Sequence, residues 1–256
     1  MSLRLHDAQI PLGRRALLRS SLAAAALVCL EGRRAAAAPR PRALIYRGPA
    51  AYPESAAAVA EAIAHRGVLS AGYIGPGEST PLTAAGLRGA TLYVQPGGGE
   101  VEAAWPLMAP HASTITSWVR GGGHYLGLCL GAYLAADDPG FGLWPGRVFD
   151  YKATTGAHVS TTTPQAATVS WRGTSRSMYV QDPPTFTVDA GAHRLVTLGH
   201  YGSGHLAGVS ARVGGGRVTL LGPHPEAPPA WYPTGLRPVG RDPEAWRVAE
   251  HIALSW

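Results

Sequence analysis

The residues best suited to chemistry in this sequence begin with a cysteine framed by two glycines. Cys129 is the centre of Gly-Leu-Cys-Leu-Gly at 127–131, directly after the apolar stretch 124–126. Glycines on both sides of a nucleophile permit a strained strand-to-helix turn, which lifts the side chain out of a sheet beside a free backbone N–H. A helix N-terminus at that point favours thiolate over thiol. The pattern predicts a nucleophilic cysteine, and the alternative is a buried apolar cysteine.

A second motif, Gly-Pro-His-Pro-Glu at 222–226, follows the apolar run 218–221. A thiol nucleophile needs a base within hydrogen-bond reach, and the base needs an acceptor on its other ring nitrogen. His224 and Glu226 supply those two parts. We therefore predict a Cys129, His224 and Glu226 triad, against the alternative that His224 is one of several solvated histidines.

Together these motifs resemble the class I glutamine amidotransferase superfamily, whose members use a Cys-His-Glu triad on a flavodoxin-like sheet. Within it, the run 121–133 and the upstream Gln-Pro-Gly-Gly-Gly at 95–99 are most similar to the N-terminal domain of biotin–protein ligases. The resemblance spans most of residues 38–256. It implies that Cys129 is the nucleophile, His224 its base and Glu226 the orienting acid.

The resemblance also implies an oxyanion hole and a departure in the substrate pocket. The hole would be formed by the Gly97 and Gly98 turn together with the Leu130 amide. Glutamine-hydrolysing members usually carry Gln two positions after the last glycine of the turn, where it helps to hold the substrate, whereas this chain has Tyr133. Tyr133 is therefore a candidate substrate-binding residue, and the fit to free glutamine is weakened. The chain also has no ATP-binding loop and no ligase domain.

The first 37 residues have the pattern of an export signal. Residues 1–19 are basic, 20–30 form an apolar core of eleven residues, and 35–39 end in small residues that suit signal peptidase. A run of that length is too short for a bilayer, which takes about 20 residues, and the flanks have the signal-peptide order. Arg14 and Arg15 add a twin-arginine pattern. We expect export to the periplasm or the exterior, with an amphipathic or disordered extension as the alternative.

Cleavage near Ala37 would also remove Cys29 and most of the net positive charge. Cys29 invites a lipoprotein interpretation, but Val28 stands where a small residue is expected. Without residues 1–38 the chain keeps 16 basic and 14 acidic side chains, so its net charge falls from +6 to +2. The high isoelectric point thus gives no argument for nucleic acid as a partner. After cleavage no span long enough for an integral membrane protein is expected, Cys129 is the one cysteine left, and the oligomeric state stays open.

The elements that would position these residues alternate between strand and helix. We predict strands at 43–46, 72–74, 90–94 and 125–128, and helices at 55–65, 114–119 and 130–135. Such alternation in about 218 residues predicts one α/β domain, a flavodoxin-like doubly wound and mostly parallel sheet with helices on both faces. Its ligand crevice lies beyond the carboxyl ends of the strands, where both motifs and the glycine turn fall.

The second half of the domain has a different pattern. Residues 148–188 are rich in Thr, Ser, Val and Tyr and contain two adjacent prolines, which predicts a small antiparallel extension. The runs 205–213 and 217–221, joined by three glycines, predict a hairpin that delivers His224 to the crevice. The final helix is expected at 243–254, with Asp242 as its cap.

Other chemistries find little support, so we expect no cofactor and no metal. The sequence has no Gly-x-Ser-x-Gly, dinucleotide, phosphate-loop or His-Glu-x-x-His motif. Lys152 is better explained as a surface or loop residue than as a Schiff-base former. His200 and His205 could line a site, but no acidic partner stands at ligand spacing.

Three functions remain open from the sequence. The first is an exported thiol hydrolase that acts on an amide or peptide bond of a small-molecule or peptide substrate through Cys129. The second is a glutamine amidotransferase subunit that supplies ammonia to a partner, and export counts against it because ATP-coupled synthetases are cytoplasmic. The third is a binding or scaffold module that keeps the turn for reasons of fold alone.

Overall fold

A computed structural model describes residues 42–234 and 243–254. The predicted signal at 1–37 and the predicted cap Asp242 lie outside this range. None of the helices in these two ranges is both long enough and apolar enough to cross a bilayer.

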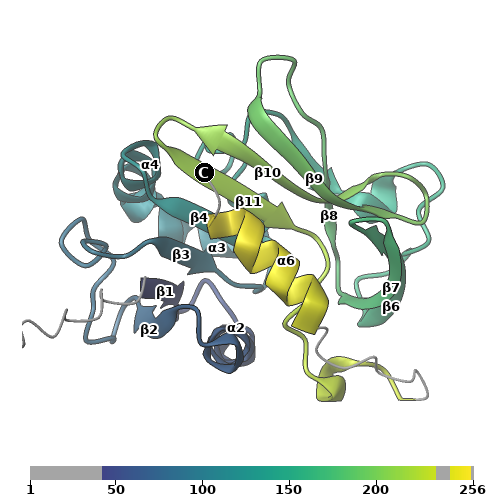
Figure 1. Ribbon diagram of the computed structural model, residues 1–256, viewed down its shortest axis with the longest axis horizontal. Helices are drawn as coiled ribbons and strands as arrows, with labels where there is room; N and C mark the ends of the chain where they lie inside the picture. Colours follow the sequence, from purple (N-terminus) through teal and green to yellow (C-terminus); the bar gives the residue numbers. More distant parts are fainter. Residues whose placement is uncertain (1–41, 235–242, 255–256) are drawn as a thin grey trace, which may run out of the picture. The chain divides into compact units, whose positions relative to one another are not determined.

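Five parallel strands form the half of the sheet that carries the predicted motifs (Figure 1). They are β1 (Arg42–Tyr46), β2 (Ser70–Ile74), β3 (Leu92–Gln95), β4 (His124–Leu128) and β11 (Gly216–Leu221), in the order β2-β1-β3-β4-β11. This is the flavodoxin-like order 2-1-3-4-5 with β11 as the fifth strand, which confirms the predicted fold class. In the register, Gln95 lies opposite Gly127, and Leu221 lies opposite Leu128. The carboxyl ends of β3, β4 and β11 therefore finish level, at one edge.

Helices cover both faces of this parallel half, as expected. One face packs on α2 (Pro53–Arg66) and α6 (Pro243–Leu254), and the other on α3 (Val101–Met108), α4 (Ala112–Arg120) and the single turn α5 (Leu130–Tyr133). Each face of the sheet has its own hydrophobic core. Alternate residues of β1 pack into these two cores, with Ala43 and Ile45 in the first and Leu44 and Tyr46 in the second. Burial on both faces explains why β1, β3, β4 and β11 are mostly apolar, whereas the edge strand β2 is partly exposed.

The antiparallel half is larger than the small extension that the sequence suggested. After β11 the same sheet continues through β10 (Leu206–Val213), β9 (His193–Tyr201), β6 (Gln165–Trp171) and β7 (Thr174–Val180). A further pair, β5 (Val148–Asp150) and β8 (Pro184–Phe186), attaches through β10. The predicted hairpin is present, with its turn at Gly214 and Gly215. Gly214 has a φ of 59°, which favours glycine.

Several element boundaries also differ from the prediction. Helix α3 was missed because Pro106 lies inside it, and β9 was missed among exposed polar residues. The helix expected at 130–135 ends at Tyr133. The chain then reverses direction after residue 136. The amides of Phe141, Gly142 and Leu143 donate hydrogen bonds to carbonyl oxygens of residues 134–136. The remaining short helices are η1 (Ala109–His111), η2 (Tyr151–Ala153) and η3 (Pro229–Trp231).

Candidate active site

Cys129 occupies a strained turn between β4 and α5. Its φ of 49° and ψ of −108° lie outside the regions that most non-glycine residues adopt. The two framing glycines are needed for close packing: a Cβ on Gly127 would lie 2.3 Å from the Gly131 carbonyl oxygen, and one on Gly131 would lie 2.0 Å from the Gln95 oxygen. The turn therefore has the geometry of a nucleophile elbow. Because α5 is a single turn, its dipole is smaller than the sequence suggested.

A buried polar network supports the elbow from below. The Tyr125 hydroxyl donates to the Gly131 carbonyl oxygen at 2.6 Å, and the Tyr93 hydroxyl donates to Oε1 of Gln95 at 2.6 Å. The Gln95 amide in turn donates to the Ala50 carbonyl oxygen at 3.1 Å. The first bond joins β4 to α5 on either side of the elbow, and the other two fasten the end of β3 to the loop before α2. Sequence reasoning missed this network because Tyr93, Gln95 and Tyr125 have the pattern of ordinary residues of a buried strand.

His224 and Glu226 form a buried pair just beyond the end of β11. Nδ1 of His224 lies 2.8 Å from Oε1 of Glu226, and the two residues are 5% and 0% exposed. Burial lowers the pKa of His224, but the charge of Glu226 and the interaction with Cys129 outweigh it and raise this pKa to about 10. The imidazolium is thus the favoured form at neutral pH. The His224 amide donates to the Tyr179 carbonyl oxygen at 2.9 Å, which fixes the loop.

Aromatic rings enclose the imidazole. Tyr179 and Trp231 lie edge to face with the His224 ring, at centroid distances of 5.5 and 5.8 Å. Burial, with the nearby charges of Cys129 and Glu226, raises the pKa of Tyr179 to about 12, so its hydroxyl stays neutral. Sequence reasoning missed these two residues: Tyr179 comes from β7, far from both motifs in the chain, and Trp231 comes from η3, five residues after Glu226. They shield the histidine from water.

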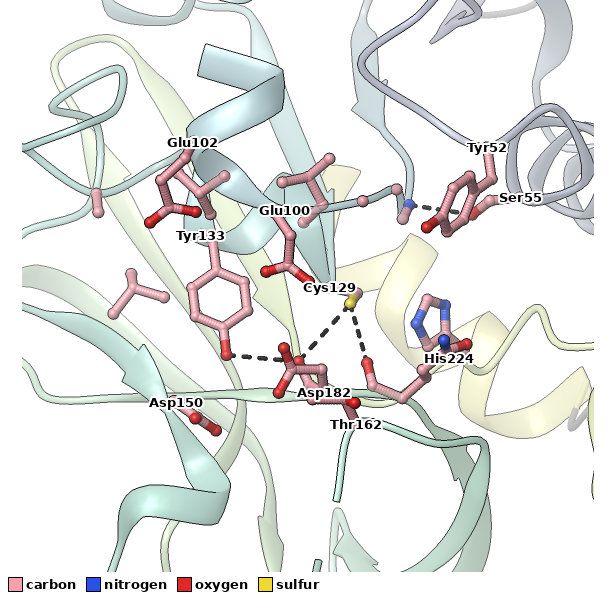
Figure 2. A pocket seen from close by; sticks show the side chains of 18 of the residues that line it. Tyr52, Ser55, Glu100, Glu102, Cys129, Tyr133, Asp150, Thr162, Asp182 and His224 are labelled. Carbon is pink, nitrogen blue, oxygen red and sulfur yellow. Dashed lines mark hydrogen bonds between the residues drawn. The ribbon is translucent and has the colours of Figure 1, made fainter. Parts of the chain in front are cut away.

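The Cys129 thiol lies beside the loop between β7 and β8. Its Sγ lies 3.4 Å from the Gln181 carbonyl oxygen and 4.0 Å from that of Asp182 (Figure 2). The Tyr133 hydroxyl donates to the same Asp182 oxygen at 3.4 Å. Lys152 forms ion pairs with both Asp150 and Asp182, which fasten this loop. Lys152 therefore lies at the site with a structural role, rather than on a remote surface.

The predicted oxyanion donors lie together but are not equivalent. The Gly97 N–H already donates to the Ser55 hydroxyl oxygen at 3.0 Å, so it is engaged. Within the described residues the Gly98 and Leu130 N–H groups have no hydrogen-bond acceptor. Gly97 has a different use: a Cβ there would lie 2.9 Å from Cε1 of His224, so glycine allows the imidazole to approach. Ser55, from α2, is a contributor that sequence reasoning missed.

A cavity of about 570 Å³ opens over these groups. Cys129, Leu130, Tyr133, His224 and both glycines of the turn lie in its wall. Burial raises the pKa of Tyr133 well above its usual value, and nearby negative charge raises it further. Tyr133 therefore stays a neutral hydrogen-bond donor.

The remaining candidates do not form a second site. His205 Nδ1 shares a hydrogen bond with Ser203 at 3.0 Å, and His200 is exposed on β9. Across residues 42–234 and 243–254, no three His, Cys, Asp or Glu side chains are grouped as metal ligands would be.

Comparison with known proteins agrees with this architecture. Residues 42–145 match the family model described as biotin-protein ligase, N terminal. The matched segment is similar to that family and covers less than half of the chain. It contains the Gly97 and Gly98 turn and the Cys129 elbow, whereas His224 and Glu226 lie beyond it. A search of curated proteins found no match to the chain.

Solved structures show the same fold at low identity. A glutamine amidotransferase from Thermotoga maritima is 17% identical with a TM-score of 0.53, over 75% of this chain and 78% of that one. A ThuA-like protein from Bacteroides uniformis is 11% identical with a TM-score of 0.53, over 87% and 94% of the two chains. A Salmonella typhimurium protein, described as cytoplasmic, is 11% identical with a TM-score of 0.51, over 82% and 98%. The fold is glutamine amidotransferase-like.

Proposed function

We propose that this protein is a cysteine-dependent hydrolase of amide or peptide bonds, with Cys129 as nucleophile, His224 as acid and base, and Glu226 as the orienting group. The observation that carries the proposal is that His224, paired with the buried Glu226, lines the same cavity as Cys129. A buried imidazole with an ionic partner, next to a thiol on a strained turn, is the arrangement that activates a nucleophile. A scaffold would gain no stability from a strained cysteine at this position.

The chemistry follows from the positions of these groups. The Cys129 thiolate attacks the amide carbonyl carbon, and the N–H groups of Gly98 and Leu130 stabilise the oxyanion. The His224 imidazolium then gives its proton to the leaving nitrogen, which departs as an amine and leaves a thioester on Cys129. Neutral His224 next accepts a proton from water, the water oxygen attacks the thioester, and the acid product leaves with the thiolate restored. The net reaction adds one water to the amide.

A thiol that rests against the Gln181 carbonyl oxygen has to rotate toward the substrate before it attacks. Catalytic hydrogen bonds are often loose before substrate binds, so this resting position is compatible with catalysis. The loop from β7 to β8 would then present its carbonyl oxygens to the substrate in place of the thiol.

The second candidate is the ammonia-supplying role that the name of the Thermotoga neighbour suggests. At 17% identity, the similarity to this neighbour shows only a shared fold and not a shared activity. In addition, Tyr133 stands where glutamine-hydrolysing members usually carry Gln. Release of glutamate from glutamine, measured with the purified protein, would favour this candidate over the hydrolase.

Alkylation of Cys129 by limiting iodoacetamide tests the proposal against a scaffold. We expect wild type to react faster at pH 6 than N-acetylcysteine, whose thiol resembles the free side chain with a pKa of about 8.5. His224→Ala should remove that advantage, whereas His200→Ala, an exposed histidine on β9, should keep it. Equal profiles for wild type and His224→Ala would contradict the triad and favour the scaffold.

We also propose that residues 1–37 direct export by a twin-arginine route. The pair Arg14 and Arg15, followed by a short apolar core, supports this proposal. Replacing both arginines with lysine should trap the precursor in the cytoplasm, and the exported protein should begin near Ala38. Unchanged export would contradict the twin-arginine route, and a lipid on Cys29 would contradict cleavage after it.

A further inference from the structure

The cavity that contains Cys129 has a strongly acidic lining. Six carboxylates line it: Glu54, Glu100, Glu102, Asp138, Asp150 and Asp182. Lys152 is the one lysine or arginine among the lining residues, and it is already held between Asp150 and Asp182. The other four carboxylates make no ion pair with any residue in the described part of the chain. A cleft lined by one sign of charge concentrates ligands of the opposite sign.

Two further features of the cavity favour the same ligand chemistry. The carbonyl oxygens of Gln181 and Asp182 face the nucleophile and can only accept hydrogen bonds. Aromatic side chains also line the cavity, from Tyr52, Tyr133, Tyr179 and Trp231. Aromatic faces and carbonyl oxygens both bind ammonium and guanidinium groups well. The carboxylates, the carbonyl oxygens and the aromatic rings of the cavity thus each favour a positively charged ligand.

The arrangement around Cys129 indicates which part of the substrate carries the charge. Figure 2 shows Glu100, Glu102, Asp150 and Asp182 around Tyr133, with His224 on the opposite side of Cys129. The proximity of Asp150, Asp182 and Glu100 to Tyr133 also contributes to the raised pKa of its hydroxyl, after burial and the charge of Cys129. His224 must reach the leaving nitrogen to protonate it. The leaving group therefore lies on the histidine side, and the acyl group extends towards Tyr133 and the carboxylates.

We propose that the substrates of this cavity are amides whose acyl portion carries an ammonium or guanidinium group, such as a peptide bond that follows lysine or arginine. The inference rests on the proposed function and names its substrate class. Free glutamine fits less well, because its α-carboxylate needs a basic partner and Lys152 is held by two aspartates. The residue that would select the cation most directly is Glu100, the N-cap residue of α3, which lines the cavity.

Matched substrates test the charge preference. We expect the 4-nitroanilide of N-acetyl-lysine to have a kcat/KM at least about tenfold above that of N-acetyl-norleucine, its uncharged analogue, with N-acetyl-glutamate slowest. Raising the ionic strength from about 0.01 M to about 1 M shortens the Debye length from about 30 to about 3 Å, so the lysine advantage should shrink. Equal rates for lysine and norleucine would overturn the inference while leaving the hydrolase proposal intact.

A variant and its control localise the preference. Glu100→Gln removes one carboxylate without a change of shape and should lower the lysine-to-norleucine ratio. Asp189→Asn, at an exposed carboxylate outside the cavity lining, should keep the wild-type ratio. An equal fall of the ratio in both variants would contradict a role for the cavity.

Binding separates this inference from the hydrolase proposal. Titration of Cys129→Ala with N-acetyl-lysinamide and N-acetyl-norleucinamide should show at least about tenfold tighter binding of the cation. If no anilide acylates Cys129 in wild type but the cation still binds more tightly, the hydrolase proposal fails and the charge selectivity stands. Equal binding of the two amides overturns the selectivity, whatever the activity.

Discussion

Nδ1 of His224 lies 2.8 Å from Oε1 of Glu226, and the rest of the protein buries both side chains. Because the other carboxylate oxygen of Glu226 has no hydrogen-bond partner among the described residues, the histidine is its principal stabilising contact. The pair links the end of β11 to the elbow at the end of β4, since the charge of Glu226 favours the imidazolium beside Cys129.

Glu226→Gln tests this link. The substitution keeps the size of the side chain and removes its charge, so the pKa of His224 should fall towards its usual value. We expect acylation of Cys129 to slow by about a hundredfold, a typical loss when acid–base catalysis is impaired. Cys129→Ala should abolish the acyl-enzyme completely, since it removes the nucleophile itself. Mass spectrometry of the intact protein after mixing with an activated ester measures both. An unchanged acylation rate in Glu226→Gln would show that the carboxylate does not assist the histidine.

The stability of the protein should depend on pH through His224. Its pKa is raised from 6.5 to about 10 on folding, because Glu226 and Cys129 outweigh the opposing effect of burial. A raised folded-state pKa gives a stabilisation that is fully present below about pH 6.5 and lost as pH rises to about 10. Urea unfolding at intervals between pH 6 and 10 measures this loss. His224→Gln should show a shallower decline over the same range. Parallel curves for the two proteins would contradict the raised pKa.

The strained backbone of Cys129 predicts an unusual order of stability. Cys129 has a φ of 49°, which glycine adopts at little cost and other residues adopt at about 1–3 kcal/mol. Cys129→Gly should therefore be more stable than Cys129→Ala, by about 1 kcal/mol after the greater freedom of unfolded glycine is counted. Urea unfolding of the two variants gives the comparison. If Cys129→Ala is equally stable or more stable, the elbow is not strained.

Gly98→Val tests the oxyanion hole. A Cβ at Gly98 would lie 2.5 Å from Cδ2 of Leu130 and 3.1 Å from Cα of Ala51, so a branched side chain must displace the turn. Loss of one oxyanion donor costs about 2.7–4 kcal/mol, or about a hundred- to thousandfold in acylation rate. Gly191→Val is the matched control, since a Cβ there meets no atom within 4 Å. If Gly98→Val has the same melting temperature as the wild type and acylates as fast, the Gly98 N–H is not an oxyanion donor.

Sequence patterns predicted the parallel half of the fold well, for a physical reason. Strands that are buried on both faces are almost continuously apolar, and the glycines that the elbow needs are visible as Gly127 and Gly131. Such local signals also placed Cys129 and His224 at the same edge of the sheet. The positions of these two residues were therefore predicted from the sequence, and their catalytic roles stay a prediction.

The parts that sequence reasoning missed depend on tertiary contacts, most of them between segments that are distant in the sequence. Ser55 of α2 accepts a hydrogen bond from the Gly97 amide, and Tyr179 of β7 and Trp231 of η3 pack against His224. None of these residues differs locally from ordinary helix, strand or loop positions, so only the folded chain reveals them. The size of the antiparallel half was underestimated because β9 alternates poorly at its exposed start.

The rate at which an activated amide or ester acylates Cys129, compared with N-acetylcysteine at the same pH, tests the central claim most directly. We expect wild type to form a single adduct on Cys129 far faster than the free thiol does, and water then to release it. His224→Ala should acylate at least about a hundredfold more slowly than wild type. Acylation of wild type no faster than N-acetylcysteine, or an adduct rate unchanged by His224→Ala, would contradict a catalytic Cys129.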